Sequence, residues 1–369
     1  MMRRLALVAA AGLVALSALP ATAQQKVVNV FNWSDYIDES VLEDFTKETG
    51  IKVRYDVFDS NEVLETKLLA GKTGYDVVVP TGSFLQRQIK AGVFQKLDKS
   101  KLPNLQYMWP EITSRLAVYD PGNEHAVNYM WGTTGIGYNV DMVKQRLGDV
   151  PMNTWDIIFK PENLSKLKDC GVYILDAPEE VLPAALRYLG MDPDSKNPDD
   201  IAKAGEMLMK VRPFIRKFDS GGIINAMARG DICIAVAWSG DMFQAKNRAE
   251  EAAKKSKKKP ITIAYVIPKE GALMWFDNFA IPKDAKNVDA ALTFINYMNR
   301  PEIAAKNSNY ISYANGNLAS QKFIDKAIMD NPSIYPDKEV FGRLFTVTTY
   351  PQDVQRVVTR TWQTFKRGK

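Results

Sequence analysis

The stretch ESVLEDFTKETGIKVRYDVFDSNEVLETKLLAGKTGYDVVVPTGSFLQRQIKAG, residues 39–92, decides the fold. Its apolar spacing predicts a helix that ends at Gly50, a strand over residues 51–58, a second helix that ends at Gly71, and a buried strand over residues 75–80. Two pairs resemble capping boxes at helix starts, Asp59 with Glu62 and Ser83 with Gln86. Strands that alternate with helices at this spacing predict the α/β class, with a parallel sheet covered by helices.

The alternation extends to both sides of this stretch. A strand is predicted before it, over residues 26–31, and four more after it, over 172–175, 232–238, 261–267 and 274–281. Helices are predicted over 181–189, capped by Asp176 with Glu179, and over 199–211. The strands in the middle of the chain suggest a second sheet, and the remainder is predicted to be mostly helical.

Composition is typical of a globular protein of about two domains. The chain has 369 residues, 46% of them hydrophobic and 25% charged, with a mean hydropathy of −0.23. The net charge of +5 is too small to indicate a nucleic-acid binder. Five lysines between Lys254 and Lys259 are interpreted as the solvated end of a helix.

Residues 1–23 have the features of an export signal. Arg3 and Arg4 precede an apolar run from Leu5 to Leu19, and Ala21-Thr22-Ala23 ends the segment. The run is shorter than the roughly 20 residues of a membrane-spanning helix. Residue 24 is Gln rather than the cysteine that lipid attachment requires, so we expect a mature protein that diffuses freely in the periplasm.

Cys170 and Cys233 are the two cysteines of the chain. In an exported protein they are interpreted either as two buried thiols or as one disulfide, and the sequence leaves both open. Their spacing, without clustered histidines, does not fit a zinc site.

Motifs of enzymes and cofactors fail at specific residues. His125, the single histidine, has no surrounding signature of a catalytic triad. Gly71-Lys72-Thr73 lacks the earlier glycine of a phosphate-binding loop, because Thr66 stands there. Gly135-Ile136-Gly137 lacks the third glycine of a dinucleotide fingerprint, because Val140 stands there. We therefore predict no catalytic residue, no cofactor and no metal site.

Aromatic side chains stand beside carboxylates in three places: residues 33–36 (WSDY), 238–241 (WSGD) and 275–277 (WFD). An organic ammonium ion favours this combination, because its charge needs a carboxylate and its methylene groups need apolar or aromatic walls. Proximity alone is weak support in a chain with 43 acidic residues. Each segment, however, lies at or just beyond the end of a predicted strand, where open α/β sheets bind their ligands.

Long runs of the sequence resemble the periplasmic polyamine-binding proteins of bacterial ABC importers, especially the putrescine-binding members. The resemblance covers essentially the whole mature chain, and the runs appear in family order. It rests on FNWSDYI, KETGIKVRYDVFDSNEVLETKLLAG, YDVVVPTGSFLQRQ, AGVFQKLDKSKLP, YMWGTTGIGYNV, DAPEE, GDICIAVAWSGD and IPKEGALMWFD.

The resemblance implies a two-lobed periplasmic-binding-protein fold of type II, in which the lobes close over a ligand in the cleft. We expect the first lobe to comprise residues 24–132 and about 260–316, and the second 133–259 and about 317–369. The same resemblance implies a disulfide between Cys170 and Cys233 within the second lobe.

The resemblance also implies twelve ligand-binding residues. Asp277, Asp241 and Glu180 would compensate the ammonium groups, while Trp33, Trp238, Trp275 and Tyr36 would enclose the methylene groups. The full set is Trp33, Ser34, Asp35, Tyr36, Thr81, Glu180, Ser220, Trp238, Asp241, Trp275, Asp277 and Tyr313.

The identity of the polyamine is less sharply indicated. At three positions, Ser34, Ser83 and Ala177, the residue resembles the one that putrescine binders have. Trp275, in contrast, stands where putrescine binders often have phenylalanine. Residues 218–222, FDSGG, also depart from the family pattern. Asp219 could add an acid near the mouth of the cleft that suits a longer or more highly charged ligand, but we interpret it as a solvated side chain.

The sequence therefore predicts an exported, monomeric substrate-binding protein that captures a polyamine and delivers it to an ABC permease. Putrescine is the favoured ligand, with spermidine, cadaverine and agmatine as alternatives. One alternative is a protein of the same fold that prefers spermidine, another cation or an amino acid. An amino acid would need a basic partner for its carboxylate, and Arg87, the nearest candidate to Thr81, is expected to face solvent. Another alternative is a secreted hydrolase that uses two of the carboxylates as an acid and base pair.

Overall fold

The computed structural model describes residues 25–369. The predicted export signal, residues 1–23, lies outside the described residues. The strands are β1 (Val27–Trp33), β2 (Lys52–Phe58), β3 (Val77–Val78), β4 (Ala126–Asn139), β5 (Val172–Ile174), β6 (Lys217–Phe218), β7 (Ile234–Trp238), β8 (Ile263–Val266), β9 (Leu273–Ala280) and β10 (Ala314–Asn315). The α-helices are α1 (Glu39–Thr49), α2 (Asn61–Ala70), α3 (Gly82–Lys90), α4 (Pro110–Leu116), α5 (Val140–Leu147), α6 (Asp156–Phe159), α7 (Pro161–Leu164), α8 (Pro178–Tyr188), α9 (Pro198–Val211), α10 (Ile223–Arg229), α11 (Ser239–Ser256), α12 (Val288–Met298), α13 (Pro301–Ile311), α14 (Lys326–Met329), α15 (Lys338–Arg343) and α16 (Gln352–Arg367).

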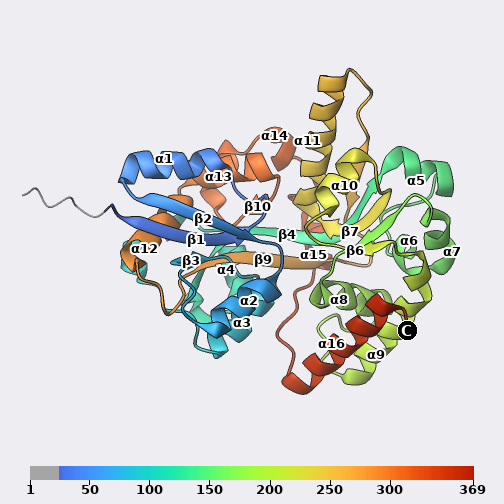
Figure 1. Ribbon diagram of the computed structural model, residues 1–369, viewed down its shortest axis with the longest axis horizontal. Coiled ribbons are helices and arrows are strands. Elements are labelled where there is room, and N and C mark those ends of the chain that lie inside the picture. Colours follow the sequence, from blue (N-terminus) through green and yellow to red (C-terminus); the bar gives the residue numbers. More distant parts are fainter. Residues whose placement is uncertain (1–24) are drawn as a thin grey trace, which may run out of the picture.

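All ten strands belong to one continuous sheet, in the order β2-β1-β3-β9-β4-β7-β5-β6, with β8 and β10 also paired to β4. The predicted second sheet is therefore wrong as a separate sheet. The parallel group β2-β1-β3 and the parallel group β7-β5-β6 are joined through the long antiparallel strands β4 and β9 (Figure 1).

Strand β4 holds the two groups together, and its glycines explain why its sequence does not follow a simple strand pattern. A Cβ atom on Gly135 would lie 2.6 Å from the backbone oxygen of Val266, and one on Gly137 would lie 2.1 Å from Sδ of Met242. These positions therefore require glycine for close packing against neighbouring elements, which is a different role from that of a nucleotide-binding loop.

The predicted helix starts are shifted. The N-cap of α2 is Ser60 rather than Asp59, and its hydroxyl accepts a 3.3 Å hydrogen bond from the Val63 amide. Helix α3 begins at Gly82, so Ser83 does not cap it, and α8 begins at Pro178 without a side-chain cap. Proline suits the first helical position, because the amide hydrogen that it lacks would have no acceptor within the helix.

The buried side chains divide the molecule into two halves. Two hydrophobic clusters, around Val30 and around Phe31, form the core of the first half. A third cluster, around Val236, forms the core of the second half and includes residues of α8, α9 and α16. Helices lie on both sides of the sheet in each half (Figure 1).

The predicted disulfide is confirmed. Cys170 and Cys233 are joined, and their Cα atoms are 5.5 Å apart. The bridge lies just before β5 and β7, two neighbouring parallel strands of the second half. It closes a segment with a sequence separation of 63 residues.

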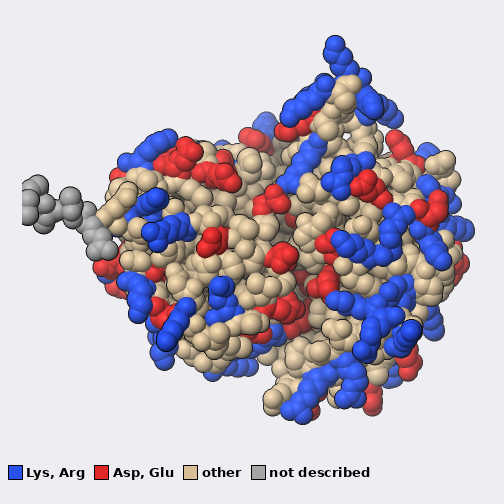
Figure 2. Space-filling view, viewed as in Figure 1, with Lys and Arg blue, Asp and Glu red and all other residues tan. Residues whose placement is uncertain are grey.

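Helix α11 projects from the second half, and its lysine-rich end reaches solvent, as expected (Figures 1 and 2). The helix ends with Lys257 in the left-handed conformation, and cationic side chains are favourable there because of the helix dipole. Within residues 25–369, no helix is both long enough and apolar enough to cross a membrane.

A candidate cation-binding cleft

One pocket contains all twelve residues predicted to bind ligand. It lies between the two halves and has an empty volume of about 570 Å³, part of it open to solvent, a size usual for small-molecule sites. Four further residues line it: Phe58, Asp59, Gly221 and Ile224.

Strand ends bring the first group of side chains together. Trp33 ends β1, and Ser34, Asp35 and Tyr36 follow it in the loop before α1. Trp238 ends β7 in the other half. The indole rings of Trp33 and Trp238 meet edge to face with their centroids 5.8 Å apart, so aromatic surfaces from both halves face the pocket.

Strand β9 supplies Trp275 and Asp277, which are two positions apart and therefore on one face of the strand. Asp277 is 4% exposed. Its Oδ1 accepts a 2.7 Å hydrogen bond from the Thr81 hydroxyl, and its Oδ2 accepts a 2.8 Å bond from the Tyr36 hydroxyl. Burial raises the pKa of Asp277 to about 7, although both hydrogen bonds lower it.

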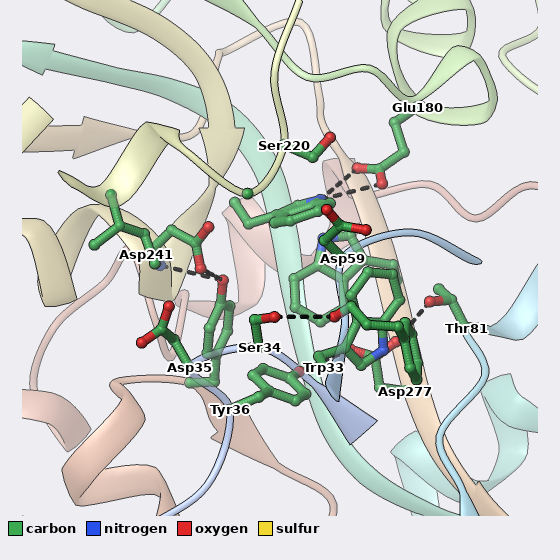
Figure 3. Close-up of a pocket in the computed structure, with 16 residues that line it drawn as sticks. Trp33, Ser34, Asp35, Tyr36, Asp59, Thr81, Glu180, Ser220, Asp241 and Asp277 are labelled. Atoms are coloured by element: carbon green, nitrogen blue, oxygen red, sulfur yellow. Dashed lines mark hydrogen bonds between the residues drawn. The ribbon is translucent and has the colours of Figure 1, made fainter. Parts of the chain in front are cut away.

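Asp241 lies in the first turn of α11 at the other end of the pocket (Figure 3). Its Oδ1 accepts a 2.6 Å hydrogen bond from the Tyr313 hydroxyl, which in turn accepts a 3.1 Å bond from the Asp241 amide. Burial raises the pKa of Asp241 to about 7, against the lowering effect of the Tyr313 bond. Tyr313 also packs against Trp275, with ring centroids 5.4 Å apart.

Glu180 is the third carboxyl group of the pocket. The Trp238 indole donates to both of its oxygens, at 3.1 and 2.9 Å, and the Thr134 hydroxyl donates to Oε2. Desolvation inside the cleft raises the pKa of Glu180 to about 7, although these hydrogen bonds lower it. Glu180 lies in the first turn of α8, where a negative charge is favourable.

Three of the twelve residues are engaged with protein groups at the edge of the pocket. The Ser34 hydroxyl donates to the Phe58 carbonyl at 3.2 Å, and the Ser220 hydroxyl accepts from the Asp176 amide at 3.1 Å. Asp35 accepts a 2.6 Å bond from Nη2 of Arg248 on α11, which links the two halves across the opening.

The lining contains five acidic residues and, within the described chain, no lysine, arginine or histidine. Asp277 and Glu180 therefore lack a basic partner that would offset their desolvation. Asp241 has only the charge of Arg248 nearby, which lowers its pKa less than burial raises it. A cation in the pocket would provide that partner and restore the charged form of the carboxyl groups. Aromatic rings between the acids suit the apolar middle of an organic cation.

Asp59 is the functional candidate that the sequence analysis assigned to a different role. It directly follows β2, so the rule that pointed to Trp33 and Asp35, a polar residue at the end of a parallel strand, applies to it equally. Phe58 packs against Trp33 with ring centroids 4.7 Å apart. Gly221 and Ile224 lie just before and at the start of α10 and have no comparable signal.

Two expectations about charged side chains are wrong. Arg87 does not face solvent, because its guanidinium contacts Glu65 at 2.5 Å and Glu179 at 2.7 Å. Asp219 is not simply solvated: it accepts bonds from Lys217 Nζ at 2.5 Å and from the Gly222 amide at 2.9 Å.

The described residues offer little support for a catalytic histidine or a metal site. His125 contacts Asp120, Nδ1 to Oδ1 at 2.9 Å, in a structural pair away from the pocket. Between residues 25 and 369, no three histidine, cysteine or acidic residues are arranged to hold a metal ion.

Comparison with known proteins places this geometry in a family. Residues 40–336 match the family described as bacterial extracellular solute-binding protein. The putrescine-binding periplasmic protein SpuD of Pseudomonas aeruginosa is 55% identical over 94% of this chain and 94% of its own length. The putrescine-binding periplasmic protein PotF of Escherichia coli is 52% identical over 98% of this chain and 96% of its own length. A solved structure of a putative spermidine/putrescine ABC transporter protein from Listeria monocytogenes is 33% identical, with a TM-score of 0.80 over 93% of this chain and 100% of that one.

Fold and cleft together define a two-lobed substrate-binding protein of the periplasm, as the sequence predicted. The chain belongs to the family of bacterial extracellular solute-binding proteins. Its relatives are transport proteins rather than enzymes, so the hydrolase alternative is not supported.

Proposed function

We propose that the protein captures putrescine in the cleft and delivers it to an ABC permease. The observation that carries this proposal is the charge of the pocket: three carboxyl groups with raised pKa values and no basic residue in the described lining. Relatives with more than half of their residues identical are named for putrescine binding, which supports the same ligand.

In this proposal the two ammonium groups of putrescine occupy opposite ends of the pocket. Figure 3 places Asp277 and Thr81 on one side, Asp241 and Asp35 on the other, and Glu180 with Ser220 above them. One ammonium group is held by Asp277 and the other by Asp241, and Glu180 adds a third carboxyl group to the same pocket. The indoles of Trp33, Trp238 and Trp275 and the ring of Tyr36 enclose the methylene chain.

We further propose that a monomer binds the ligand as its lobes close, each lobe corresponding to one half of the molecule. The boundaries expected near residues 260 and 317 remain predictions, and the cores support an adjustment. Ile263 packs in the second half, whereas Ile324 and Leu344 pack in the first. The last crossing between lobes would then fall between Val347 and Tyr350.

Calorimetric titration of ligand-stripped protein tests the proposal. Putrescine should bind tightly with one-to-one stoichiometry, and recovered ligand should be chemically unchanged. Tighter binding of spermidine would favour the alternative ligand, for which the structure offers a specific reason: a second acidic pocket adjoins the first. Binding of neither amine would contradict the proposed function.

A further inference from the structure

The ligand pocket continues into a second pocket. The two share Glu180, Trp238 and Trp275 in their walls, so the cleft extends past Glu180 towards the start of α8. Within the described chain, the second lining holds no basic residue and five acidic ones: Asp59, Glu62, Asp176, Glu179 and Glu180. Figure 2 shows acidic side chains gathered along the notch between the two halves.

An open hollow lies outside the second pocket, and there the acids meet built-in cations. It shares Glu62, Asp176 and Glu179 with the second pocket and adds Arg87 and Lys366. Lys366 of α16 contacts Asp176. Two of the five acids are therefore already compensated by side chains of the protein itself.

Arg87 is held firmly in this position. Its Nε and Nη2 contact the two oxygens of Glu65 on α2, at 2.5 and 2.8 Å, and its guanidinium stacks on the Phe84 ring, 3.8 Å from the centroid. Its Nη1 crosses the cleft from α3 to Glu179 on α8, at 2.7 Å. The Ser83 hydroxyl donates to the other oxygen of Glu179 at 3.2 Å. Glu179 is 7% exposed, so its charge is satisfied inside the protein.

These contacts have a consequence for ligand length, which rests on the proposed function. A diamine can be held between Asp277 and Asp241, beside Glu180, without reaching Glu179 at the start of α8. A triamine has one more ammonium group, and the continuous lining leads from Glu180 to Glu179. That group would find Glu179 already paired and would be repelled by the guanidinium beside it, while still losing its hydration.

We propose that Arg87 is a specificity-determining residue: its guanidinium compensates Glu179 in place of a third ammonium group, so the cleft selects diamines over triamines. Arg87 does not contact the diamine in this arrangement. It acts through Glu179, and its removal should affect the choice of ligand more than the binding of putrescine.

The test is calorimetric titration of putrescine and spermidine, at pH 8, into wild type, Arg87→Met and Arg87→Lys. The ratio of the spermidine Kd to the putrescine Kd should fall at least tenfold in Arg87→Met and stay within about threefold of wild type in Arg87→Lys, which keeps the charge. Arg300→Met is a matched control, because Arg300 also pairs with a glutamate, Glu48, and stacks on an aromatic ring, Tyr297, but lines none of these pockets.

A second set of variants tests the same idea from Glu179. Arg87→Met is expected to improve spermidine affinity relative to putrescine. Arg87→Met/Glu179→Gln should not show this improvement, because no free carboxylate remains at this position for the third ammonium group. Glu179→Gln alone should weaken spermidine binding further and leave putrescine within about threefold. If Arg87→Met does not fold, as a Tm measurement would show, this single variant decides the matter.

Outcomes that overturn the inference differ from those that overturn the proposed function. If Arg87→Met weakens the binding of putrescine and of spermidine equally, Arg87 only holds the two halves together. An unchanged Kd ratio in a folded Arg87→Met, or a wild type that prefers spermidine, would also overturn it. Failure of the wild type to bind either amine would instead contradict the proposed function itself.

Discussion

The Tyr36 hydroxyl donates a 2.8 Å hydrogen bond to Oδ2 of Asp277, a residue 241 positions away in the sequence. Both side chains are buried, and together with Thr81 they fix the Asp277 carboxylate at one end of the pocket. Both oxygens of the carboxylate accept hydrogen bonds, but it has no basic partner. This environment is expected for a carboxylate that binds a cationic ligand.

Asp277→Asn should weaken putrescine binding by about 2 to 4 kcal/mol, because the bound ammonium group loses its charged partner in a desolvated site. Isothermal titration calorimetry would detect this as a Kd increase of roughly 100-fold. Asp289→Asn is a suitable control, since that carboxylate is 87% exposed and pairs with Lys101 on the surface. Equal affinities for wild type and Asp277→Asn would remove Asp277 from the binding site.

Putrescine affinity should fall as the pH drops from 8 to 5.5. In the ligand-free protein, burial or desolvation raises the pKa of Glu180, Asp241 and Asp277 to about 7, so protons compete with the ligand below that pH. Titrations in buffers of different ionisation enthalpy should show protons released on binding at pH 6.5 and fewer at pH 8. An affinity that is flat across this range would contradict the assignment of these carboxyl groups to the ligand.

The same shifts predict a pH-dependent effect of ligand on stability. A carboxyl group whose pKa is raised from about 4 in the unfolded chain to about 7 in the folded protein stabilises the fold at low pH, and this contribution is lost as the pH rises through 7. Bound putrescine offsets this loss, because its ammonium groups pair with the ionised carboxyl groups. The rise in Tm on adding putrescine should therefore be larger at pH 8 than at pH 5.5. Asp277→Asn should show a smaller difference between the two pH values.

The pocket could be predicted from the sequence to the extent that strand ends mark it. Trp33 and Trp238 end strands, and Asp35 and Asp241 follow within three residues, so the sheet topology brings them to one edge. The resemblance to a family placed Glu180 and Tyr313, which strand ends alone do not indicate. Asp59 was assigned to a helix cap, because a strand end and a helix start share that short loop.

The contacts that the sequence does not indicate involve groups whose partners lie far away in the sequence. Thr81 is the N-cap of α3, but its hydroxyl is used by Asp277 and Asn61 rather than by the helix. The position of Arg87 within a helix carries no information about Glu179, which is 92 residues away on the other side of the cleft. The single sheet could not be predicted either, because close-packed glycines interrupt the pattern of β4.

The Cys170–Cys233 bridge should affect stability and leave ligand affinity unchanged. A count of free thiols on unfolded, unreduced protein should give zero, and Cys170→Ala/Cys233→Ala should lower the free energy of unfolding by about 2 to 4 kcal/mol. Urea denaturation measures this loss. Because neither cysteine lines the pocket, the Kd for putrescine at 25 °C should stay within about twofold, and a larger change would show that the bridge also shapes the site.

Gly132 on β4 sets the position of the Trp275 indole. A Cβ atom at this glycine would lie 2.6 Å from Cζ2 and 2.7 Å from Cη2 of the indole, so Gly132→Ala should push the ring from its place in the pocket wall. We expect putrescine affinity to fall about tenfold, by calorimetry, with the protein still folded. Gly342→Ala is the matched control, because nothing lies within 4 Å of its Cβ position.

A second substitution separates this steric effect from a general loss of packing. Phenylalanine lacks the two indole carbons that meet Gly132, so Trp275→Phe should tolerate Gly132→Ala with less than a threefold further change in Kd. Trp275→Phe alone should change the ratio of putrescine to spermidine affinity, since the indole borders both the first and the second pocket. Equal effects on the two amines would show that Trp275 is only a wall, and a tenfold loss in the double variant relative to Trp275→Phe would show that Gly132 acts through another neighbour, such as Ser239.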